Sequence, residues 1–364
     1  MLAVSTLMTA RSFRLVFATI ISLAFFHALY VWKPLNWVLH DVSTERAQSF
    51  ETTTTSDGSS ASHIPPKTVG TIELKTHSLI SDTAIPHIPD KVWHSAKDNH
   101  VTDTQQTWIN SWTDKNPSHR EELLTDRSGE AFVLAYYQQT RPDIVEVYKA
   151  LPIPILRADL LRYLIVLAEG GIWSDLDVTC DNPVVNWVPS EYKDRDIDMI
   201  VGLEFDFDWR GPGTEVASQF CNWAFAARPS SRNLQVVVDS VIKVLKDIAR
   251  TNGVQISGIT LEMLPDVVNV TGPKIMTIAL LESLGQLLGR EVDDRDFSGI
   301  KYPKLVGDLL IMPGVSFAAA QNGYPKDQGD ALVTHHYEGS WKQADAEAKE
   351  RKKEKQQPRA HTTK

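Results

Sequence analysis

Residues 157–177 read RADLLRYLIVLAEGGIWSDLD, and this stretch combines a helix, a break and a strand in one unit. Its first part belongs to residues 154–168, an apolar run with proline at its start and Gly170 and Gly171 after its end, which predicts a helix. Residues 172–178 are then expected to form a strand that runs into polar residues. The unit therefore predicts an α/β domain in which a strand follows directly from a helix.

Apolar stretches of strand length alternate with helical ones on both sides of this unit, between residues 86 and 342. Such alternation is typical of an α/β domain. A polar break is expected at residues 126–129. We expect further strands at residues 91–94, 121–125, 199–205, 220–226, 309–312 and 331–335, and helices at residues 232–249 and 273–288.

Asp175 and Asp177 are candidate metal and phosphate ligands, because alternate residues can aim two carboxylates at one hard cation. The D-x-D pattern alone is weak evidence, because it also occurs elsewhere in the sequence. Asp159 and Arg162 on the preceding helix distinguish the pair at residues 175 and 177 from the other matches. Those two helix residues are three apart, so they share a helix face. The alternative is that they form an exposed ion pair within the helix. The competing D-x-D matches lie at residues 194/196, 196/198, 206/208 and 294/296.

The runs RADLLRY at residues 157–163 and EGGIWSDLD at residues 169–177 resemble the long spaced signature of glycosyltransferase family 32. The similarity extends from residue 88 to residue 342, and within the family it is greatest to the fungal initiation-specific α-1,6-mannosyltransferases. The resemblance implies a single nucleotide-sugar-binding domain of GT-A type with a mixed central sheet. It also implies GDP-mannose as donor, a glycan as acceptor, retention of the anomeric configuration and a divalent cation, usually Mn²⁺.

The resemblance implies donor-binding roles for four residues outside the D-x-D pair. Asp159 and Arg162 would hold hydroxyl groups of the ribose and the sugar, and Trp173 would lie against the donor. Trp93, at the end of the matching segment on the first strand, is placed with them. The chain departs from the family pattern at Trp173, where tyrosine is commoner, and at His94, where glutamine is frequent. These departures affect the expected donor or acceptor preference and leave the expected fold unchanged.

Carried over in the same way, Asp175 and Asp177 would engage the donor and manganese, with His336 as a third protein ligand. A cation there would stabilise the charge that develops on the diphosphate as the glycosidic bond breaks. The segment after His336 has the pattern H-x-x-G-x-x-K of other metal-dependent retaining enzymes. Gly339 would let the backbone approach the diphosphate, and Lys342 would contact a phosphate oxygen.

Five further residues have alternatives that the sequence leaves open. Glu204, after an apolar strand, is interpreted as a catalytic carboxylate that stabilises the reacting sugar or positions the acceptor, or else as a surface carboxylate. His335 is expected to point away from the site and to be structural. Asn269 begins an N-V-T sequon, which is usable only in the secretory lumen. Cys180 and Cys221, the two cysteines, either pair there or remain separate buried thiols.

The N-terminal region contains eighteen residues without a formal charge, a helix of about 27 Å that suits a bilayer. Arginines precede it and one lysine follows, which favours a cytosolic N-terminus; a cleaved signal peptide is the alternative. The resemblance implies a single-pass type II Golgi protein with a lumenal catalytic domain, and a Golgi mannosyltransferase complex as partner. The expected organisation is a cytosolic tail (1–14), a signal anchor (15–32), a Ser/Thr-rich stem (33–85), the catalytic domain (86–342) and a charged disordered tail (343–364).

Composition and rival motifs limit the other function classes. The chain is 42% hydrophobic, which excludes disorder throughout. Its 37 basic and 46 acidic residues give a net negative charge, which does not favour binding to nucleic acid. A haloacid-dehalogenase-type phosphohydrolase is one rival, because residues 175–179 fit D-x-D-x-T with Asp293 and Asp294 as a metal pair. A non-catalytic carbohydrate-binding homologue is another rival. Within the family, inositol phosphoceramide is the alternative acceptor.

Overall fold

The computed structural model describes residues 83–207, 216–322, 324, 328–339, 346–347 and 350–351. All of them fall in one compact unit, His77–Lys364. The expected signal anchor, the expected stem up to residue 82, and Lys342 at the end of the H-x-x-G-x-x-K pattern lie outside the described residues.

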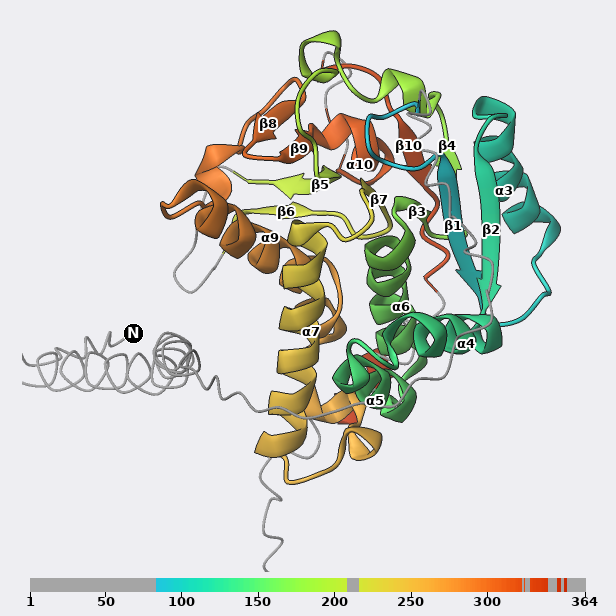
Figure 1. Cartoon of the computed structure of the whole chain (residues 1–364), viewed down its shortest axis with the longest axis vertical. Coiled ribbons are helices and arrows are strands. Elements are labelled where there is room, and N and C mark those ends of the chain that lie inside the picture. The colour runs from blue at the N-terminus through green and yellow to red at the C-terminus, as the bar shows by residue number, and fades with distance from the viewer. Residues whose placement is uncertain are drawn as a thin grey trace, which may run out of the picture. The chain divides into compact units, whose positions relative to one another are not determined.

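A mixed sheet of eight strands organises the described residues (Figure 1). Its order is β2-β1-β3-β7-β5-β9-β8, and β6 pairs with β5 beside this path. β1 runs parallel to β2 and β3, and β5 runs parallel to β9, while the other pairs are antiparallel. The expected mixed central sheet is therefore present. The strands are β1 (Lys91–Ala96), β2 (Arg120–Thr125), β3 (Gly171–Ser174), β5 (Met199–Asp206), β6 (Ser218–Phe220), β7 (Ala224–Ala227), β8 (Lys304–Val306) and β9 (Leu309–Met312).

Helices cover both faces of this sheet, and the strands are therefore apolar on both sides. In β9, Leu309 and Ile311 join one core cluster while Leu310 and Met312 join the other, as the two-residue period of a strand requires. Helices α4 to α9 pack on the first face, and α3 and α10 contribute to the second. The helices are α3 (Asp103–Lys115), α4 (Asp126–Tyr137), α5 (Pro142–Ala150), α6 (Pro154–Glu169), α7 (Arg232–Thr251), α8 (Val267–Val270), α9 (Pro273–Leu288) and α10 (Gly314–Asn322).

Two glycines connect α6 to β3 at the centre of the fold. Gly170 and Gly171 have φ values of 67° and 103°, a region that side chains with a Cβ rarely adopt. A Cβ would lie 2.6 Å from Pro229 Cδ at the first position and 2.8 Å from the Lys91 carbonyl oxygen at the second. The glycine pair is thus required both for the reversal of the chain and for close packing of its neighbours.

Two predicted strands are broken by turns in the structure. The strand expected at residues 172–178 ends at Ser174, and a second strand, β4 (Val178–Cys180), pairs antiparallel with β10 (Val333–His335). A turn separates them because the Asp175 N–H donates to the Trp223 carbonyl (2.8 Å) and the Val178 N–H donates to the Asp175 carbonyl (3.2 Å). The stretch 220–226 likewise divides between β6 and β7.

The polar break expected at residues 126–129 is instead the first turn of α4. Thr125 caps this helix, accepting from the Ser128 N–H (3.2 Å) while the Ser128 hydroxyl accepts from the Thr125 N–H (2.8 Å). Gly129 is needed there for packing, since a Cβ would lie 2.7 Å from Leu161 Cδ2. The polar residues therefore begin a helix.

Three other features bear on the sequence-based expectations. Val267–Leu288 is long and apolar enough to cross a membrane, but 61% of that window is buried within the domain, as in a core helix. Cys180 and Cys221 are both buried and free, so the pairing alternative is wrong and the alternative of separate thiols is confirmed. In the tail expected to be disordered, the described residues are helical, and Arg351 Nε lies 2.9 Å from Glu262 Oε1.

His94 on β1 makes the stability of the fold depend on pH. Its side chain is fully buried, its Nδ1 donates to the Ser174 carbonyl (2.8 Å), and burial lowers its pKa to about 4. An unfolded histidine titrates near 6.5, so between these values the unfolded chain binds the extra proton. Stability therefore falls as the pH is lowered through this window, by about 3 kcal/mol from this residue.

We expect His94→Gln to reduce the pH dependence of the unfolding free energy between about pH 6.5 and pH 4. Glutamine keeps an N–H donor for the Ser174 carbonyl but has no titrating group. Urea unfolding of both proteins across this range measures the effect as the difference between the two curves. Parallel curves would show that His94 does not titrate on unfolding as described.

Candidate functional site

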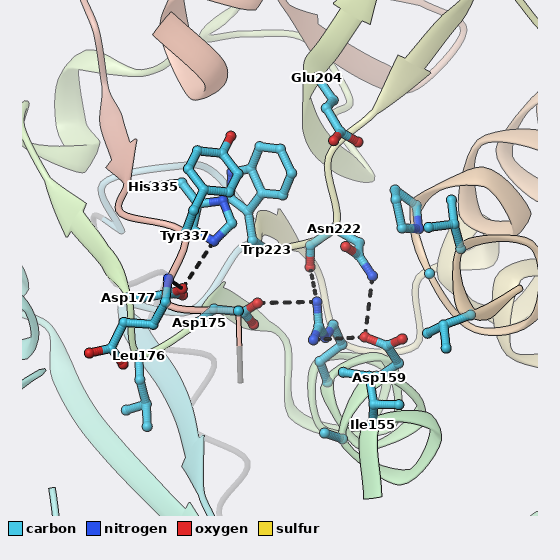
Figure 2. Close-up of a pocket in the computed structure, with 18 of the residues that line it drawn as sticks. Ile155, Asp159, Asp175, Leu176, Asp177, Glu204, Asn222, Trp223, His335 and Tyr337 are labelled. Carbon is cyan, nitrogen blue, oxygen red and sulfur yellow. Dashed lines mark hydrogen bonds and ion pairs between the residues drawn. The ribbon is translucent and has the colours of Figure 1, made fainter. Parts of the chain in front are cut away.

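A cavity of about 740 Å³ opens where β3 and β5 end and α6 begins, and Figure 2 shows many of its lining residues. Side chains from segments far apart in the sequence meet there, from α6, the turn after β3, the end of β5 and the segment after β10. Six of the predicted site residues line the cavity: Asp159, Arg162, Asp175, Asp177, Glu204 and Gly339.

A buried guanidinium connects two of the predicted carboxylates. Arg162 Nη2 lies 2.8 Å from Asp159 Oδ1, and its Nη1 lies 3.4 Å from Asp175 Oδ2. Nη1 also donates to the Asn222 carbonyl at 2.8 Å. Burial alone would lower the pKa of Arg162, but Asp175 and Asp159 outweigh it and raise the pKa. The pair predicted from its helix spacing is thus buried, and the exposed ion-pair alternative is wrong.

A second layer of buried polar groups holds Asp159. The Thr271 hydroxyl donates to Asp159 Oδ2 (2.7 Å), and Asn222 Nδ2 lies 3.5 Å from Asp159 Oδ1. Tyr163 accepts from Asn222 Nδ2 (3.1 Å) and donates to the Thr271 carbonyl (2.9 Å). Burial raises the pKa of Asp159 to about 6, against the opposing effects of Arg162 and the Thr271 hydroxyl. These partners favour the charged form of Asp159 against the effect of burial.

Asp175 is held from behind by Trp173. The Trp173 indole Nε1 donates to Asp175 Oδ1 (2.7 Å), and the guanidinium of Arg162 lies 5.7 Å from the centre of the indole ring. Burial raises the pKa of Asp175, with Arg162 opposing it and Asp177 adding to it. Trp173 is 1% exposed and is not among the lining residues, so it orients Asp175 and does not itself face the cavity.

Asp177 is engaged by His335 and by the backbone after it. His335 Nε2 lies 3.3 Å from Asp177 Oδ2, and the Glu338 N–H donates to the same oxygen at 3.0 Å. Burial would raise the pKa of Asp177, but the contacts with His335 and Glu338 outweigh it and lower the pKa. Asp177 is therefore held in its charged form at neutral pH.

The structure reverses the predicted orientations of the two adjacent histidines, of which His336 was expected to face the site and His335 to point away from it. His335 lines the cavity, whereas His336 is exposed, stacks on Trp108 at 4.5 Å, and has Nε2 3.2 Å from the Thr179 hydroxyl. The reason is the register of β10 with β4, in which His335 lies opposite Val178. Because alternate residues of a strand face opposite sides, only one histidine can face the carboxylates, and it is His335.

Trp93 is also outside the cavity lining. It is 5% exposed, its Nε1 donates to the Gly170 carbonyl (2.8 Å), and its ring packs edge-on against Phe132. Its donor-binding role is therefore not supported by its position, and it supports the glycine junction between α6 and β3.

Several lining residues have no counterpart in the sequence-based expectations. Asn222, Trp223 and Tyr337 line the cavity, while Thr271 sits behind Asp159. Trp223 stacks on His335 with ring centres 4.5 Å apart, and Tyr337 lies 3.8 Å from the same ring. Asn222 and Trp223 lie within the stretch predicted as a single strand over residues 220–226, and no sequence motif joins them to Tyr337 or Thr271.

The described residues offer a limited set of metal ligands. Among them, no group of three or more His, Cys, Asp or Glu side chains is arranged to hold an ion. Asp177 remains a suitable ligand because it is charged, and Asp175 lies two residues away. A hard cation held by one or two carboxylates commonly takes its other ligands from phosphate and water. The carboxylate pair therefore fits such a cation, whereas His336 does not.

We expect Thr271→Val to destabilise the domain by about 2 kcal/mol at neutral pH, because a buried carboxylate loses its hydroxyl donor. Without that donor the pKa of Asp159 rises further above its present value of about 6. A raised carboxyl pKa costs stability as the pH increases through it, so the loss should be larger at pH 8 than at pH 5. Urea unfolding at both pH values measures it.

Two control variants separate the hydroxyl from other effects at this position. Thr271→Ser keeps the hydroxyl and should show no such pH dependence. Asn269→Gln removes the sequon that Thr271→Val also destroys, while it leaves Thr271 in place. If the serine and valine variants lose equal stability at both pH values, the hydroxyl does not support Asp159.

Comparison with known proteins identifies the region around this site. Residues 102–194 match the family described as glycosyltransferase sugar-binding region containing DXD motif. An initiation-specific α-1,6-mannosyltransferase of Schizosaccharomyces pombe is 31% identical over 261 residues, 70% of this chain and 64% of that protein. An inositol phosphoceramide mannosyltransferase of the same organism is 32% identical over 111 residues, 30% of this chain and 29% of that protein.

The chain thus spans just under two thirds of the length of the initiation-specific relative. Among solved structures, a PaToxG glycosyltransferase is 14% identical, covers 55% of this chain and 71% of its own, and has a TM-score of 0.37, too low to establish a shared fold. The sequence matches extend well beyond the D-x-D pair. The resemblance to glycosyltransferase family 32, and within it to the fungal initiation-specific α-1,6-mannosyltransferases, is therefore confirmed, with the sugar-binding DXD region at residues 102–194.

Proposed function

We propose that this protein is a metal-dependent, retaining glycosyltransferase that moves mannose from GDP-mannose to a glycan, by α-1,6 transfer to N-glycan cores. The observation that carries the proposal is the convergence of Asp159, Arg162, Asp175 and Asp177 on one cavity. These residues come from the segment that matches the sugar-binding family, and relatives named as α-1,6-mannosyltransferases match over most of the chain. The donor and the acceptor are assigned from that likeness.

The charge of the cavity supports the dependence on a cation. Five carboxylates face the cavity from the described residues, against one guanidinium, that of Arg162. A nucleoside diphosphate would be repelled by such a lining unless a cation bound with it. Manganese held at Asp177, with Asp175 beside it, would supply that charge and would stabilise the diphosphate as it leaves. The carboxylates are Asp159, Asp175, Asp177, Glu204 and Glu338.

The residues of the chain position the sugar donor. Asp159 accepts from sugar hydroxyls, and Arg162 donates to them while it holds Asp159 and Asp175 in fixed orientations. An acceptor hydroxyl oxygen forms the new bond to the anomeric carbon, and the bond from that carbon to the diphosphate oxygen breaks. The bonding electron pair leaves with the diphosphate, which also takes the hydroxyl proton. Glu204 faces the same space and stabilises the positive charge on the reacting sugar.

Gly339 lines the cavity with a φ of 55°, and its lack of a side chain suits close approach of the diphosphate. Lys342 would add a phosphate contact from the segment that follows it. The proposal does not extend to His336, whose ring stacks on Trp108.

The competing functions have less support from the same cavity. A phosphohydrolase would need Asp293 and Asp294 beside Asp175, but neither is among the cavity residues, and Asp294 Oδ2 accepts from the Ser218 N–H (3.0 Å). Transfer to inositol phosphoceramide remains the second candidate within the family, since relatives with that name match about a third of the chain. The longer match to the initiation-specific relative favours a glycan acceptor.

Asp177→Asn should abolish mannose transfer from GDP-mannose while leaving the fold intact, because an amide keeps the shape and removes the charge that holds the cation. Transfer rates against manganese concentration measure the loss, and the thermal midpoint checks folding. Asp98→Asn makes the same change outside the cavity and should behave like the parent. An Asp177→Asn enzyme with near-normal, chelator-insensitive transfer would contradict the mechanism.

The proposed location is the Golgi membrane, with residues 15–32 as a single type II anchor and the catalytic domain in the lumen. A complex with other Golgi mannosyltransferases is part of this proposal. Protease added to sealed microsomes should therefore spare the domain and digest it only after detergent is added. Digestion of the C-terminal half in intact microsomes would reverse the proposed orientation.

A further inference from the structure

The cavity has a second group of polar side chains, apart from the carboxylates that contact Arg162. Glu204 comes from the end of β5, and Figure 2 shows it across the cavity from Asp159 and Asp175. Gln219 Nε2 donates to its Oε2 at 2.8 Å, and Gln321 Nε2 donates to its Oε1 at 3.2 Å. Both carboxylate oxygens are therefore fixed in direction by amide groups from β6 and α10.

Tyr337 extends this chain of polar groups. Its hydroxyl donates to Gln321 Oε1. Hydrogen bonds therefore connect Tyr337 to Gln321 and Gln321 to Glu204 along the cavity wall. The backbone of Tyr337 has a φ of 56°, which costs energy for a residue with a large side chain. In this conformation its ring lies tilted against His335 and edge-on to Trp223, with ring centres 3.8 Å and 5.8 Å away. The strained backbone thus presents an aromatic ring to the cavity.

The chemistry of this wall suits a neutral sugar better than a phosphate. Amide and phenol groups both donate and accept hydrogen bonds, as sugar hydroxyls do, whereas a carboxylate only accepts and would repel a phosphate. Aromatic rings add an apolar surface for the carbon face of a sugar. The guanidinium of Arg162 contacts the other group of carboxylates, Asp159 and Asp175. The wall around Glu204 therefore suits the neutral acceptor, and the donor is left to the part of the cavity that contains Arg162 and Asp177.

The position of Tyr337 also meets the requirement that the two substrates react with each other. The residue before it, His336, donates its N–H to the Asp177 carbonyl (2.7 Å). The residue after it, Glu338, donates its N–H to Asp177 Oδ2 (3.0 Å). Tyr337 is thus fixed beside the carboxylate assigned to the cation and diphosphate. A sugar bound at its ring would lie next to the bond that breaks.

We propose that Glu204, Gln321 and Tyr337 form the subsite for a neutral hexose of the acceptor, with an α-linked mannose oligosaccharide as the class of ligand. The inference rests on the proposed function, and it names the residues that form hydrogen bonds with the hydroxyl groups of the acceptor. Gln219, which is 4% exposed, orients Glu204 from behind.

The test uses Gln321→Ala and Tyr337→Phe in the full-length chain, with a free α-linked mannose trisaccharide as acceptor. Each change removes one hydrogen-bonding group, and we expect each to raise the acceptor KM about tenfold. The KM for GDP-mannose should stay unchanged. Gln286→Ala is the matched control, because Gln286 also donates to a glutamate, Glu282 Oε1 at 3.1 Å, on the exposed surface of α9.

Calorimetric titration of the trisaccharide, with and without GDP and manganese, gives a readout that does not require turnover. Weaker binding in both cavity variants and normal binding in the Gln286→Ala control would support the subsite. Unchanged trisaccharide binding and acceptor KM, or a raised KM for GDP-mannose alone, would overturn it. Trisaccharide binding that depends on Gln321, in a protein that never consumes GDP-mannose, would support the subsite and refute the proposed function.

Discussion

The buried guanidinium of Arg162 is the interaction on which the site depends. Removing a charge from water is costly, and here the cost is offset by Asp159, Asp175 and the carbonyl of Asn222. These partners belong to α6, the turn after β3 and the bend between β6 and β7, so one ion ties three segments together. Loss of one partner from such a buried pair typically costs about 3–5 kcal/mol. The contact that shapes the cavity therefore also stabilises the domain.

The surrounding structure is arranged so that this ion can stay buried. Gly170 and Gly171, with positive φ values, let the chain reverse between α6 and β3, and Arg162 then lies beside the turn that carries Asp175. Trp173 and Thr271 then donate to the outer oxygens of the two carboxylates. Each charge is thus compensated by neutral donors as well as by its ionic partner, as buried charges require. This compensation explains why so many polar groups near the cavity are buried.

Much of this arrangement was predictable from local sequence, and the rest depends on contacts between distant residues. The helix that carries Asp159 and Arg162 has a strong apolar pattern and a clear end, so its position and the shared face of the pair were correct. The strand expected through Asp175 was wrong because its turn is set by a hydrogen bond to Trp223, 48 residues away. Local patterns contain no information about such a bond.

The assignment of the adjacent histidines failed for a related reason, and it shows what a motif can and cannot specify. A spacing such as H-x-x-G-x-x-K fixes distances along the chain, but the register of β10 with β4 decides which side chain turns inward. That register brings His335 to Asp177 and lets the chain bend sharply at Tyr337, which has a positive φ. The same bend brings the Tyr337 hydroxyl to Gln321. One pairing of short strands thus determines both the partner of the proposed metal ligand and the surface offered to the second substrate.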